Sequence, residues 1–198
     1  MFPSLPPATR AIILANVVVF LLQSLTGHAL DGPFALWPLG PYFHAWQLLT
    51  YAFLHRDLSH VFFNMFALFM FGSGLESFWG SRRFLVYYFA SVLAAAVVQL
   101  AVTTLSHLDE ATIGASGGVF GLLLAFAFYF PRQRVMLLIL PIPIPAWLFV
   151  TLYGLLELFQ GVAGTQSSVA HFAHLGGMLG GALVMLYWAA QDRARREL

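Results

Sequence analysis

Long apolar runs alternate with short polar segments along the chain, and this pattern predicts six membrane-spanning helices. A helix needs ~20 apolar residues to cross the hydrocarbon core of a bilayer, and the runs approach that length. Glycine, proline, serine and arginine interrupt the pattern between them. The six predicted spans cover approximately residues 11–26, 57–78, 84–104, 116–130, 146–160 and 169–190.

Two segments allow more than one interpretation. The first run follows Arg10 and has the character of a signal peptide, but it continues to Leu25 without a small-residue cleavage site. We therefore interpret it as a retained helix. Residues 131–145 end in alternating prolines, which lack a hydrogen-bond donor and clash with the preceding helical turn. The fifth helix is therefore expected to begin near Ala146.

Composition supports an all-α membrane protein that forms one domain over residues 1–198. Hydrophobic residues make up 60% of the chain and charged residues only 9%, whereas about 25% of an ordinary soluble domain is charged. A soluble protein of this composition would expose large apolar patches and aggregate, so we expect the lipid bilayer to surround it. The absence of cysteine excludes disulfides and thiol catalysis. A net charge of +1 provides no basic surface for nucleic acid.

The arginines predict the orientation of the bundle. The chain has no lysine, and eight of its nine arginines fall at the termini or in the second and fourth loops; Arg56 is the exception. Basic residues accumulate on the cytoplasmic side of membrane proteins. Both the N-terminus and the C-terminus are therefore expected to be cytoplasmic, and the first, third and fifth loops face outward.

Ser116 stands among glycines at the predicted start of the fourth span, flanked by Gly114, Gly117 and Gly118. Polar groups inside spans are costly and mark either function or a packed polar contact. At a helix N-terminus, free amides and the positive end of the helix dipole lie beside the hydroxyl and can stabilise an oxyanion. The same residues also suit an N-cap serine with glycines for close helix packing.

His174 on the sixth span is the base that could activate this serine. Small residues line one face of the fourth span and one face of the sixth, which would let the two helices approach closely. These residues are Gly117, Gly121 and Ala125 on the fourth span, and Gly177 and Gly181 on the sixth. Taken alone, His174 could equally hydrogen-bond to a backbone carbonyl. His171 lies one turn nearer the outer water, where we expect it to be solvated in a structural role.

Further polar residues have open interpretations. His60 and Asn64 lie one turn apart on the second span, and they suit either an oxyanion hole or a structural polar pair. Asp57 is interpreted as a helix N-terminal carboxylate. We expect no metal, because the histidines have no third clear ligand at metal-binding spacing.

The acidic residues supply no obvious partner for His174, so the pattern favours a serine–histidine dyad. Glu157 is interpreted as a polar contact at the outer end of the fifth span. Glu76 is interpreted as an ion pair with Arg82 and Arg83.

Together, these features resemble the rhomboid family of intramembrane serine proteases over nearly the whole chain. The matching segments are Trp46-Gln47-Leu48-Leu49-Thr50, Phe53-Leu54-His55, His60-x3-Asn64, Gly114-Ala115-Ser116-Gly117 and Ala173-His174-Leu175-Gly176-Gly177. The resemblance implies a six-helix bundle in which Ser116 is the nucleophile and His174 the general base. The Ser116 amide, His60 and Asn64 would hold the oxyanion, with Gly114, Gly117, Phe120 and Gly177 in supporting positions.

The resemblance also implies a setting and a substrate. The protein would need no cofactor and would cleave transmembrane segments of other proteins, and the compact six-span form suggests that it does so in a bacterial inner membrane. Its site would open to the extracytoplasmic side, with substrate entry controlled by the fifth helix and fifth loop. Two positions depart from the family pattern. Gln47 replaces an arginine that many relatives have, which leaves the anchoring of the first loop open. Phe120 replaces a tyrosine, keeping the stacking face without the hydroxyl.

Two alternatives come from other classes of function. The first is a catalytically inactive rhomboid-like protein that binds membrane segments, although such proteins typically lack the serine or the histidine. The second is a small proton-coupled transporter that uses Glu76, Glu157 and His174, although the repeated halves of many transporters are missing. The physiological substrate and the oligomeric state do not follow from the sequence.

Overall fold

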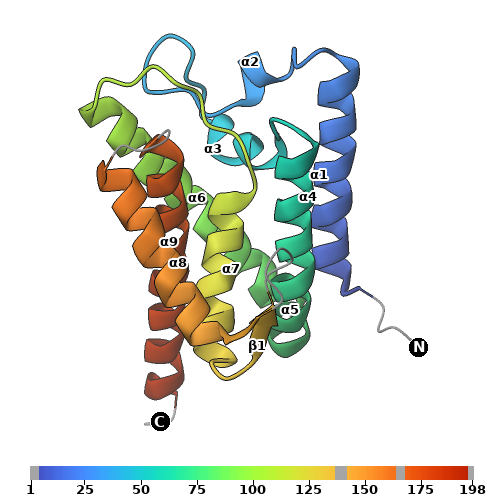
Figure 1. Cartoon of the computed structure of the whole chain (residues 1–198), viewed down its shortest axis with the longest axis vertical. Helices are drawn as coiled ribbons and strands as arrows, with labels where there is room; N and C mark the ends of the chain where they lie inside the picture. The colour runs from blue at the N-terminus through green and yellow to red at the C-terminus, as the bar shows by residue number, and fades with distance from the viewer. Residues whose placement is uncertain (1–4, 137–141, 164–167, 196–198) are drawn as a thin grey trace.

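The computed structural model describes residues 5–136, 142–163 and 168–195, which form a bundle of helices (Figure 1). All six predicted spans are helical. The helices are α1 (Pro7–Leu25), α4 (Leu58–Ala67) continued by the π-helical η2 (Leu68–Gly72) and α5 (Ser73–Trp79), α6 (Ser81–Leu105), α7 (Ser116–Tyr129), α8 (Ala146–Ala163) and α9 (Ser168–Ala194). The start of α1 and the end of α9 lie at the same end of the bundle (Figure 1).

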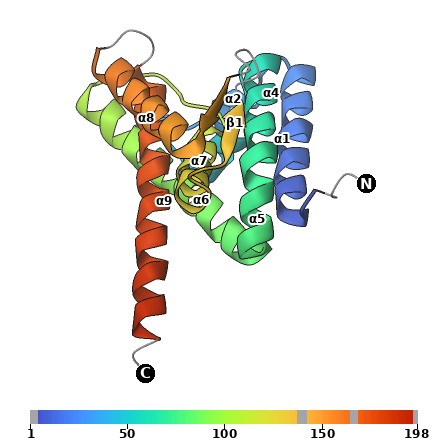
Figure 2. The ribbon, with the colours of Figure 1, turned by 60° about the horizontal axis from the view of Figure 1, so that its bottom comes forward.

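The outer surface is that of an integral membrane protein. Five helical segments among the described residues are long and apolar enough to cross a membrane: Pro7–Leu25, Leu58–Trp79, Ser81–Leu105, Ala146–Ala163 and His171–Arg195. Large apolar residues such as Leu105 and Leu186 on these helices are largely exposed. In the turned view, the C-terminal part of α9 extends beyond the other helices (Figure 2). The sixth segment, α7, has 14 residues and lies in the middle of the bundle, where most of its side chains are buried.

Small residues set the close approach of α7 and α9, as the sequence predicts. A Cβ atom on Gly177 would overlap the backbone carbonyl of Gly117, so the two helices touch at their backbones. Gly181 differs from the expectation, because it faces Tyr87 and Ser91 of α6 instead of α7. The long helix α9 packs on both α6 and α7, and its glycines are divided between these two neighbours.

The first loop is folded and anchored. It contains the short helices α2 (Asp31–Phe34) and α3 (Gln47–Thr50) and the 3₁₀ turn η1 (Tyr51–Phe53). The fully buried Gln47 side chain accepts hydrogen bonds from the backbone N–H groups of Trp37 and His44. Its amide donates to the backbone carbonyls of Pro33 and Tyr42. Gln47 therefore anchors the first loop through both the oxygen and the nitrogen of its amide. The loop is thus anchored although glutamine replaces the arginine of many relatives.

The segment before α8 forms a small hairpin that the sequence analysis did not predict. Strand β1 (Arg134–Met136) pairs antiparallel with β2 (Pro143–Pro145), with Val135 opposite Ile144. Prolines are tolerated because each strand of a two-stranded hairpin is an edge strand, where a missing N–H donor can face away from the partner. Helix α8 begins at Ala146, where the prolines end, as predicted.

The predicted ion pair of Glu76 with Arg82 and Arg83 is wrong. The Glu76 carboxylate instead accepts hydrogen bonds from the backbone N–H groups of Ala8 and Thr9 and from the hydroxyls of Thr9 and Ser81. A carboxylate at a helix N-terminus is stabilised by the free amides and the helix dipole. Glu76 therefore caps α1 and fastens it to the ends of α5 and α6.

His55 makes stability dependent on pH. It precedes α4, its side chain is fully buried, and neither ring nitrogen has a hydrogen-bond partner among the described residues. Burial, and next the nearby His60 imidazole, lower the pKa of His55 to about 4. Its pKa in the unfolded chain is about 6.5, so folding opposes protonation. The contribution to stability is complete above pH 6.5 and is lost as the pH falls toward 4.

We therefore expect acid to destabilise the wild type more than a His55→Phe variant, which fills the same space without a titratable group. The difference between the two should grow to about 3 kcal/mol as the pH falls from 7 to 4. Unfolding of both proteins in detergent across this range measures it. Parallel curves for the two proteins would show that His55 does not carry the acid sensitivity.

Candidate active site

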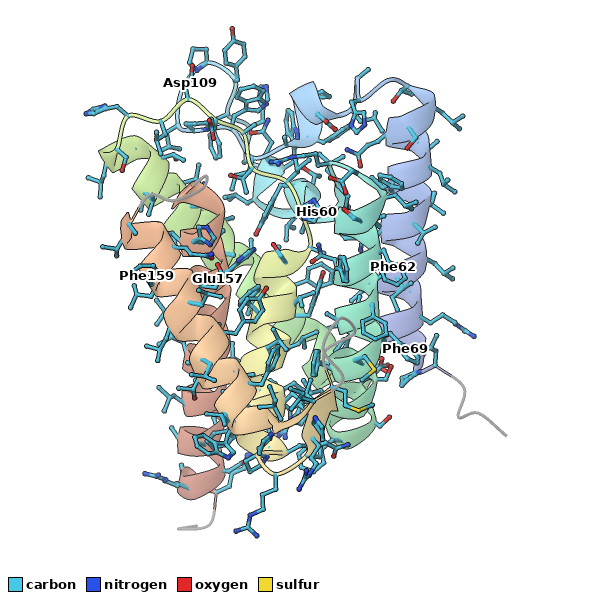
Figure 3. The ribbon with its side chains drawn as sticks, in the orientation of Figure 1. His60, Phe62, Phe69, Asp109, Glu157 and Phe159 are labelled. Atoms are coloured by element: carbon cyan, nitrogen blue, oxygen red, sulfur yellow. The ribbon has the colours of Figure 1, made fainter. Side chains whose placement is uncertain are left out.

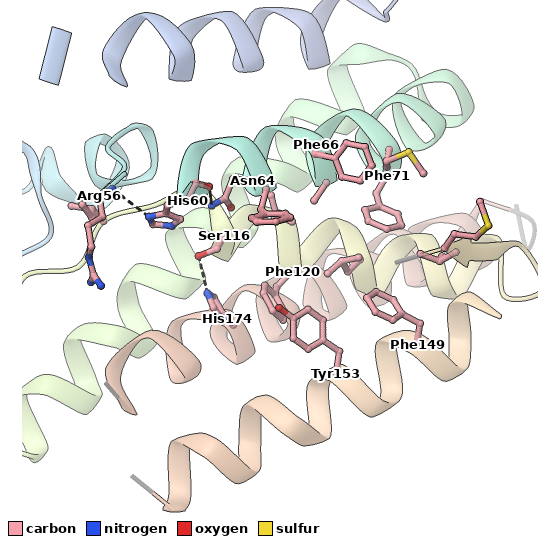
Figure 4. A pocket seen from close by; sticks show the side chains of 18 of the residues that line it. Arg56, His60, Asn64, Phe66, Phe71, Ser116, Phe120, Phe149, Tyr153 and His174 are labelled. Carbon is pink, nitrogen blue, oxygen red and sulfur yellow. Dashed lines mark hydrogen bonds between the residues drawn. The ribbon is translucent and has the colours of Figure 1, made fainter. Parts of the chain in front are cut away.

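Ser116 and His174, far apart in the sequence, meet between α7 and α9. The Ser116 Oγ lies 2.8 Å from the His174 Nε2 (Figure 4). Ala115 occupies the N-cap position of α7, and Ser116 is the first residue of the helix. The alternative of an N-cap serine is therefore wrong: the hydroxyl faces a neighbouring histidine instead of closing its own helix.

The loops before α7 fix the position of Ser116. Backbone hydrogen bonds join Leu36 of the first loop to Thr112 of the third, and the Gly114 N–H donates to the Tyr51 carbonyl at 2.9 Å. Gly114 has a φ of 129°, which side chains disfavour, and a Cβ there would come within 2.8 Å of the His60 Nε2. A glycine is required so that the chain can pass His60 and enter α7 beside it.

The His174 ring has a partner on each side. Phe120, one turn after Ser116 on α7, stacks on the imidazole with ring centroids 4.1 Å apart and planes 5° from parallel. The expected stacking face is therefore present. At the far edge of the ring, the His174 Nδ1 lies 2.9 Å from Glu157 Oε2.

The sequence analysis interpreted Glu157 only as a polar contact and missed that its partners are the two histidines of α9. The same Oε2 atom also lies 2.6 Å from the Nδ1 of His171, and the His171 side chain is buried. The prediction that water solvates His171 is therefore wrong. The sequence contains a signal for this contact. Helices α8 and α9 follow each other closely, and Glu157 and His174 are equally distant from the segment that connects them. When the two helices pack side by side, these two residues therefore lie at the same height.

The same three side chains form a possible metal-binding group. Glu157, His171 and His174 each present one ligand atom, and these atoms lie within 4.8 Å of one another. Two imidazoles and a carboxylate are ligands that zinc accepts. The sequence analysis expected no metal because a third ligand was missing, and Glu157 supplies one. Hydrogen bonds from the two imidazoles to the carboxylate already explain why these three side chains lie so close together. We therefore still predict that they hold no metal.

His60 and Asn64 reach the same place from α4. Asp57 occupies the N-cap position of α4 and accepts from the His60 N–H at 2.8 Å, in the helix-terminal role predicted for it. The His60 Nδ1 accepts from the Arg56 N–H at 3.3 Å, so the neutral ring carries its proton on Nε2. The Asn64 amide donates to the His60 carbonyl at 2.9 Å and keeps a second N–H for another acceptor.

A cavity of about 670 Å³ connects these residues. Its polar end holds His60, Asn64, Ser116 and His174 (Figure 4). The remainder runs between α4, α7 and α8 toward β1 and is lined mainly by apolar side chains. They are Phe63, Phe66, Ala67, Met70, Phe71, Val119, Phe120, Leu123, Val135, Met136, Phe149 and Tyr153. The cavity therefore offers an apolar channel that ends at a serine, a histidine and two hydrogen-bond donors.

Comparison with known proteins agrees with this arrangement. Residues 42–191 match the model of the rhomboid domain family. YdcA of Bacillus subtilis, described provisionally as a rhomboid protease, is 28% identical over 182 residues, which cover 92% of this chain and 82% of YdcA. Mitochondrial rhomboid protein 1 of Saccharomyces cerevisiae is 33% identical over 76% of this chain. Rhomboid protease GlpG of Yersinia pestis is 25% identical over 96% of it.

The coverage of these relatives differs. The aligned part spans 44% of the yeast protein and 65% of the Yersinia protein, so both relatives contain sequence that this chain does not match. The family match nevertheless covers well over half of the chain, and every residue of the site lies within it. This integral membrane protein belongs to the rhomboid family.

Proposed function

We propose that the protein is an intramembrane serine endopeptidase in which Ser116 and His174 form the catalytic dyad. The observation that carries the proposal is the 2.8 Å contact between Ser116 Oγ and His174 Nε2 at the end of the cavity. Relatives described as rhomboid proteases support the reaction class. The inactive-binder alternative is disfavoured because both residues are present and in contact.

The reaction follows from the positions of the donors and acceptors. Ser116 attacks the scissile carbonyl while its proton passes to the His174 Nε2. The carbonyl oxygen becomes an oxyanion, held by the Ser116 backbone N–H, the His60 Nε2–H and the free Asn64 N–H. His174 then protonates the leaving amine. A water molecule, deprotonated by the same histidine, hydrolyses the acyl-enzyme and restores Ser116.

The cavity indicates the class of substrate. Its apolar walls between α4 and α8 suit a transmembrane segment that enters from the lipid, and this supports the proposal that α8 controls substrate entry. Backbone carbonyls in a membrane helix are already hydrogen-bonded, so the segment must unwind before Ser116 can attack. Small residues near the cut would ease this. The described part of the fifth loop stops at residue 163, and residues 164–167 of the expected gate lie outside the described residues.

The arginine distribution and the shared end of α1 and α9 support cytoplasmic termini. The catalytic residues then lie toward the opposite, extracytoplasmic side of a bacterial inner membrane. Transmembrane protein substrates and the surrounding bilayer are the partners that this arrangement requires.

Incubation of the purified protein with a panel of transmembrane segments in liposomes tests the function. We expect cleavage of segments that carry glycine, alanine or serine near their outer end, with the cut mapped by mass spectrometry. Matched segments with leucine at these positions should resist. Failure of the folded protein to cut any member, together with proton uptake into vesicles, would favour the transporter instead.

Single replacements His60→Ala and Asn64→Ala are expected to slow cleavage without abolishing it. Loss of one oxyanion donor commonly lowers the rate by roughly 10²–10³, and the Ser116 amide remains in each variant. Single-turnover cleavage rates measure the loss. An unchanged rate in both variants would remove these side chains from the oxyanion hole.

A further inference from the structure

Glu157 is a buried charged residue on α8, which is otherwise among the most exposed helices of the bundle. Glu157 is only 3% exposed, whereas Phe159, two residues further on, is 65% exposed. Figure 3 shows Glu157 on the inner side of α8 and Phe159 on the outer side. A carboxylate in an apolar bundle is costly unless it is paired, so its position requires an explanation.

Packing holds this carboxylate against α9. Gly161, one turn after Glu157, lies so close to α9 that a Cβ atom there would be 3.2 Å from the Phe172 ring and 3.4 Å from the His171 Cβ. The two helices cannot separate at this level without losing that contact. Glu157 is therefore directed at the two histidines by the helix pair that carries it.

The hydrogen bonds determine which nitrogen of His174 carries the proton. A carboxylate has no proton to donate, so the 2.9 Å contact with Glu157 requires a proton on the His174 Nδ1. A neutral imidazole has only one N–H, which leaves a lone pair on Nε2. That lone pair lies 2.8 Å from the Ser116 Oγ. This tautomer is the one that can accept the serine proton.

We propose that Glu157 is a positioning residue that holds His174 in this tautomer and stabilises the imidazolium formed during catalysis. The inference rests on the proposed protease function and extends the dyad to a Ser116–His174–Glu157 arrangement. When Ser116 transfers its proton to Nε2, the positive charge on the ring lies beside the carboxylate. Glu157 remains unprotonated throughout, and the proton passes from Nε2 to the leaving amine.

A purely structural role is the competing explanation, because the 2.6 Å contact of Glu157 with His171 would by itself join α8 to α9. That role predicts a loss of stability when the charge is removed. The positioning role predicts a selective loss of turnover. The chain offers a matched control in Glu76, a second buried glutamate, which lies away from the cavity and accepts three hydrogen bonds from α1 and one from Ser81 of α6.

The experiment compares Glu157→Gln, Glu157→Asp and Glu76→Gln with the wild type on one transmembrane substrate. For Glu157→Gln we expect kcat to fall roughly 10²–10⁴-fold with KM changed less than about threefold, as when other triads lose their acid. The kcat of Glu157→Asp should be at least about tenfold higher than that of Glu157→Gln, because aspartate restores the charge. Glu76→Gln should lower the unfolding temperature while the folded protein keeps its kcat.

Three results would overturn the inference while leaving the protease intact, as shown by an inactive Ser116→Ala control. One is a wild-type kcat in Glu157→Gln. Another is an equal fall of kcat in Glu157→Gln and Glu76→Gln, which would mean destabilisation. The third is loss of wild-type activity with a chelator and its return with zinc, because the three side chains would then hold a metal. A wild type that cleaves nothing would instead remove the proposed function, and this inference with it.

Discussion

Replacing Ser116 with alanine is expected to reduce cleavage of a transmembrane substrate to the uncatalysed background. The change removes the oxygen atom that attacks the scissile carbonyl in the proposed mechanism. The fold should survive, because a single hydroxyl is lost beside glycines and little cavity is created; we expect a stability change of under about 1 kcal/mol. Cleavage rates and unfolding curves of the same detergent preparation measure both effects.

Ser24→Ala is the matched control for this change. Among the residues that the structure describes, the Ser24 hydroxyl donates only to the Phe20 carbonyl, on the exposed side of α1, and the variant should cleave at the wild-type rate. If Ser116→Ala also cleaves at that rate, the serine mechanism is wrong.

Replacement of His174 is the second change with a large expected effect. His174→Ala should match Ser116→Ala in severity, because a serine without its base is a weak nucleophile. The double variant should be no slower than either single variant, since residues that act as one catalytic unit are not additive. Rates of the three variants under one condition test this.

His171→Ala separates the two histidines of α9. His171 lies 2.6 Å from Glu157, whereas the contact with Ser116 belongs to His174. We therefore expect His171→Ala to retain most activity. An inactive His171→Ala beside an active and folded His174→Ala would reverse the assignment of the base.

The helices and the meeting of Ser116 with His174 could be predicted because both depend on local patterns. Apolar runs specify helices in a membrane, and the glycines on α7 and α9 allow only a few ways of packing. The contact between Gly117 and Gly177 is of this kind. Phe120 follows Ser116 by one helical turn, so its place beside the site also follows from periodicity.

The partners of the two buried glutamates could not be predicted from local patterns. Sequence proximity suggested that Glu76 pairs with Arg82 and Arg83, but the first amides of α1, which have no acceptor within their own helix, lie at this end of the bundle and donate to the Glu76 carboxylate. Arg83 instead lies over the Trp188 ring, 5.4 Å from its centroid. The partner of a buried carboxylate near a helix end depends on which helix ends pack together, and this is determined by the packing of the whole bundle.

Glu157 shows the same limit at the site itself. Glu157 lies 17 residues before His174 on another helix, so no pattern within one helix relates them, and their equal distance from the α8–α9 connection is informative only once these two helices are known to pair. The β1–β2 hairpin was missed for a different reason: its prolines correctly exclude a helix, but they do not reveal a short edge pairing.

Labelling with a fluorophosphonate probe tests the central claim most directly, because the probe reacts only with an activated serine. Incubation of the folded wild type, followed by mass spectrometry of its peptides, should give one adduct, on Ser116. Ser116→Ala should give none, and His174→Ala should label far more slowly. An adduct on another serine, or equal labelling of Ser116 with and without His174, would contradict the claim that these two residues form the catalytic dyad.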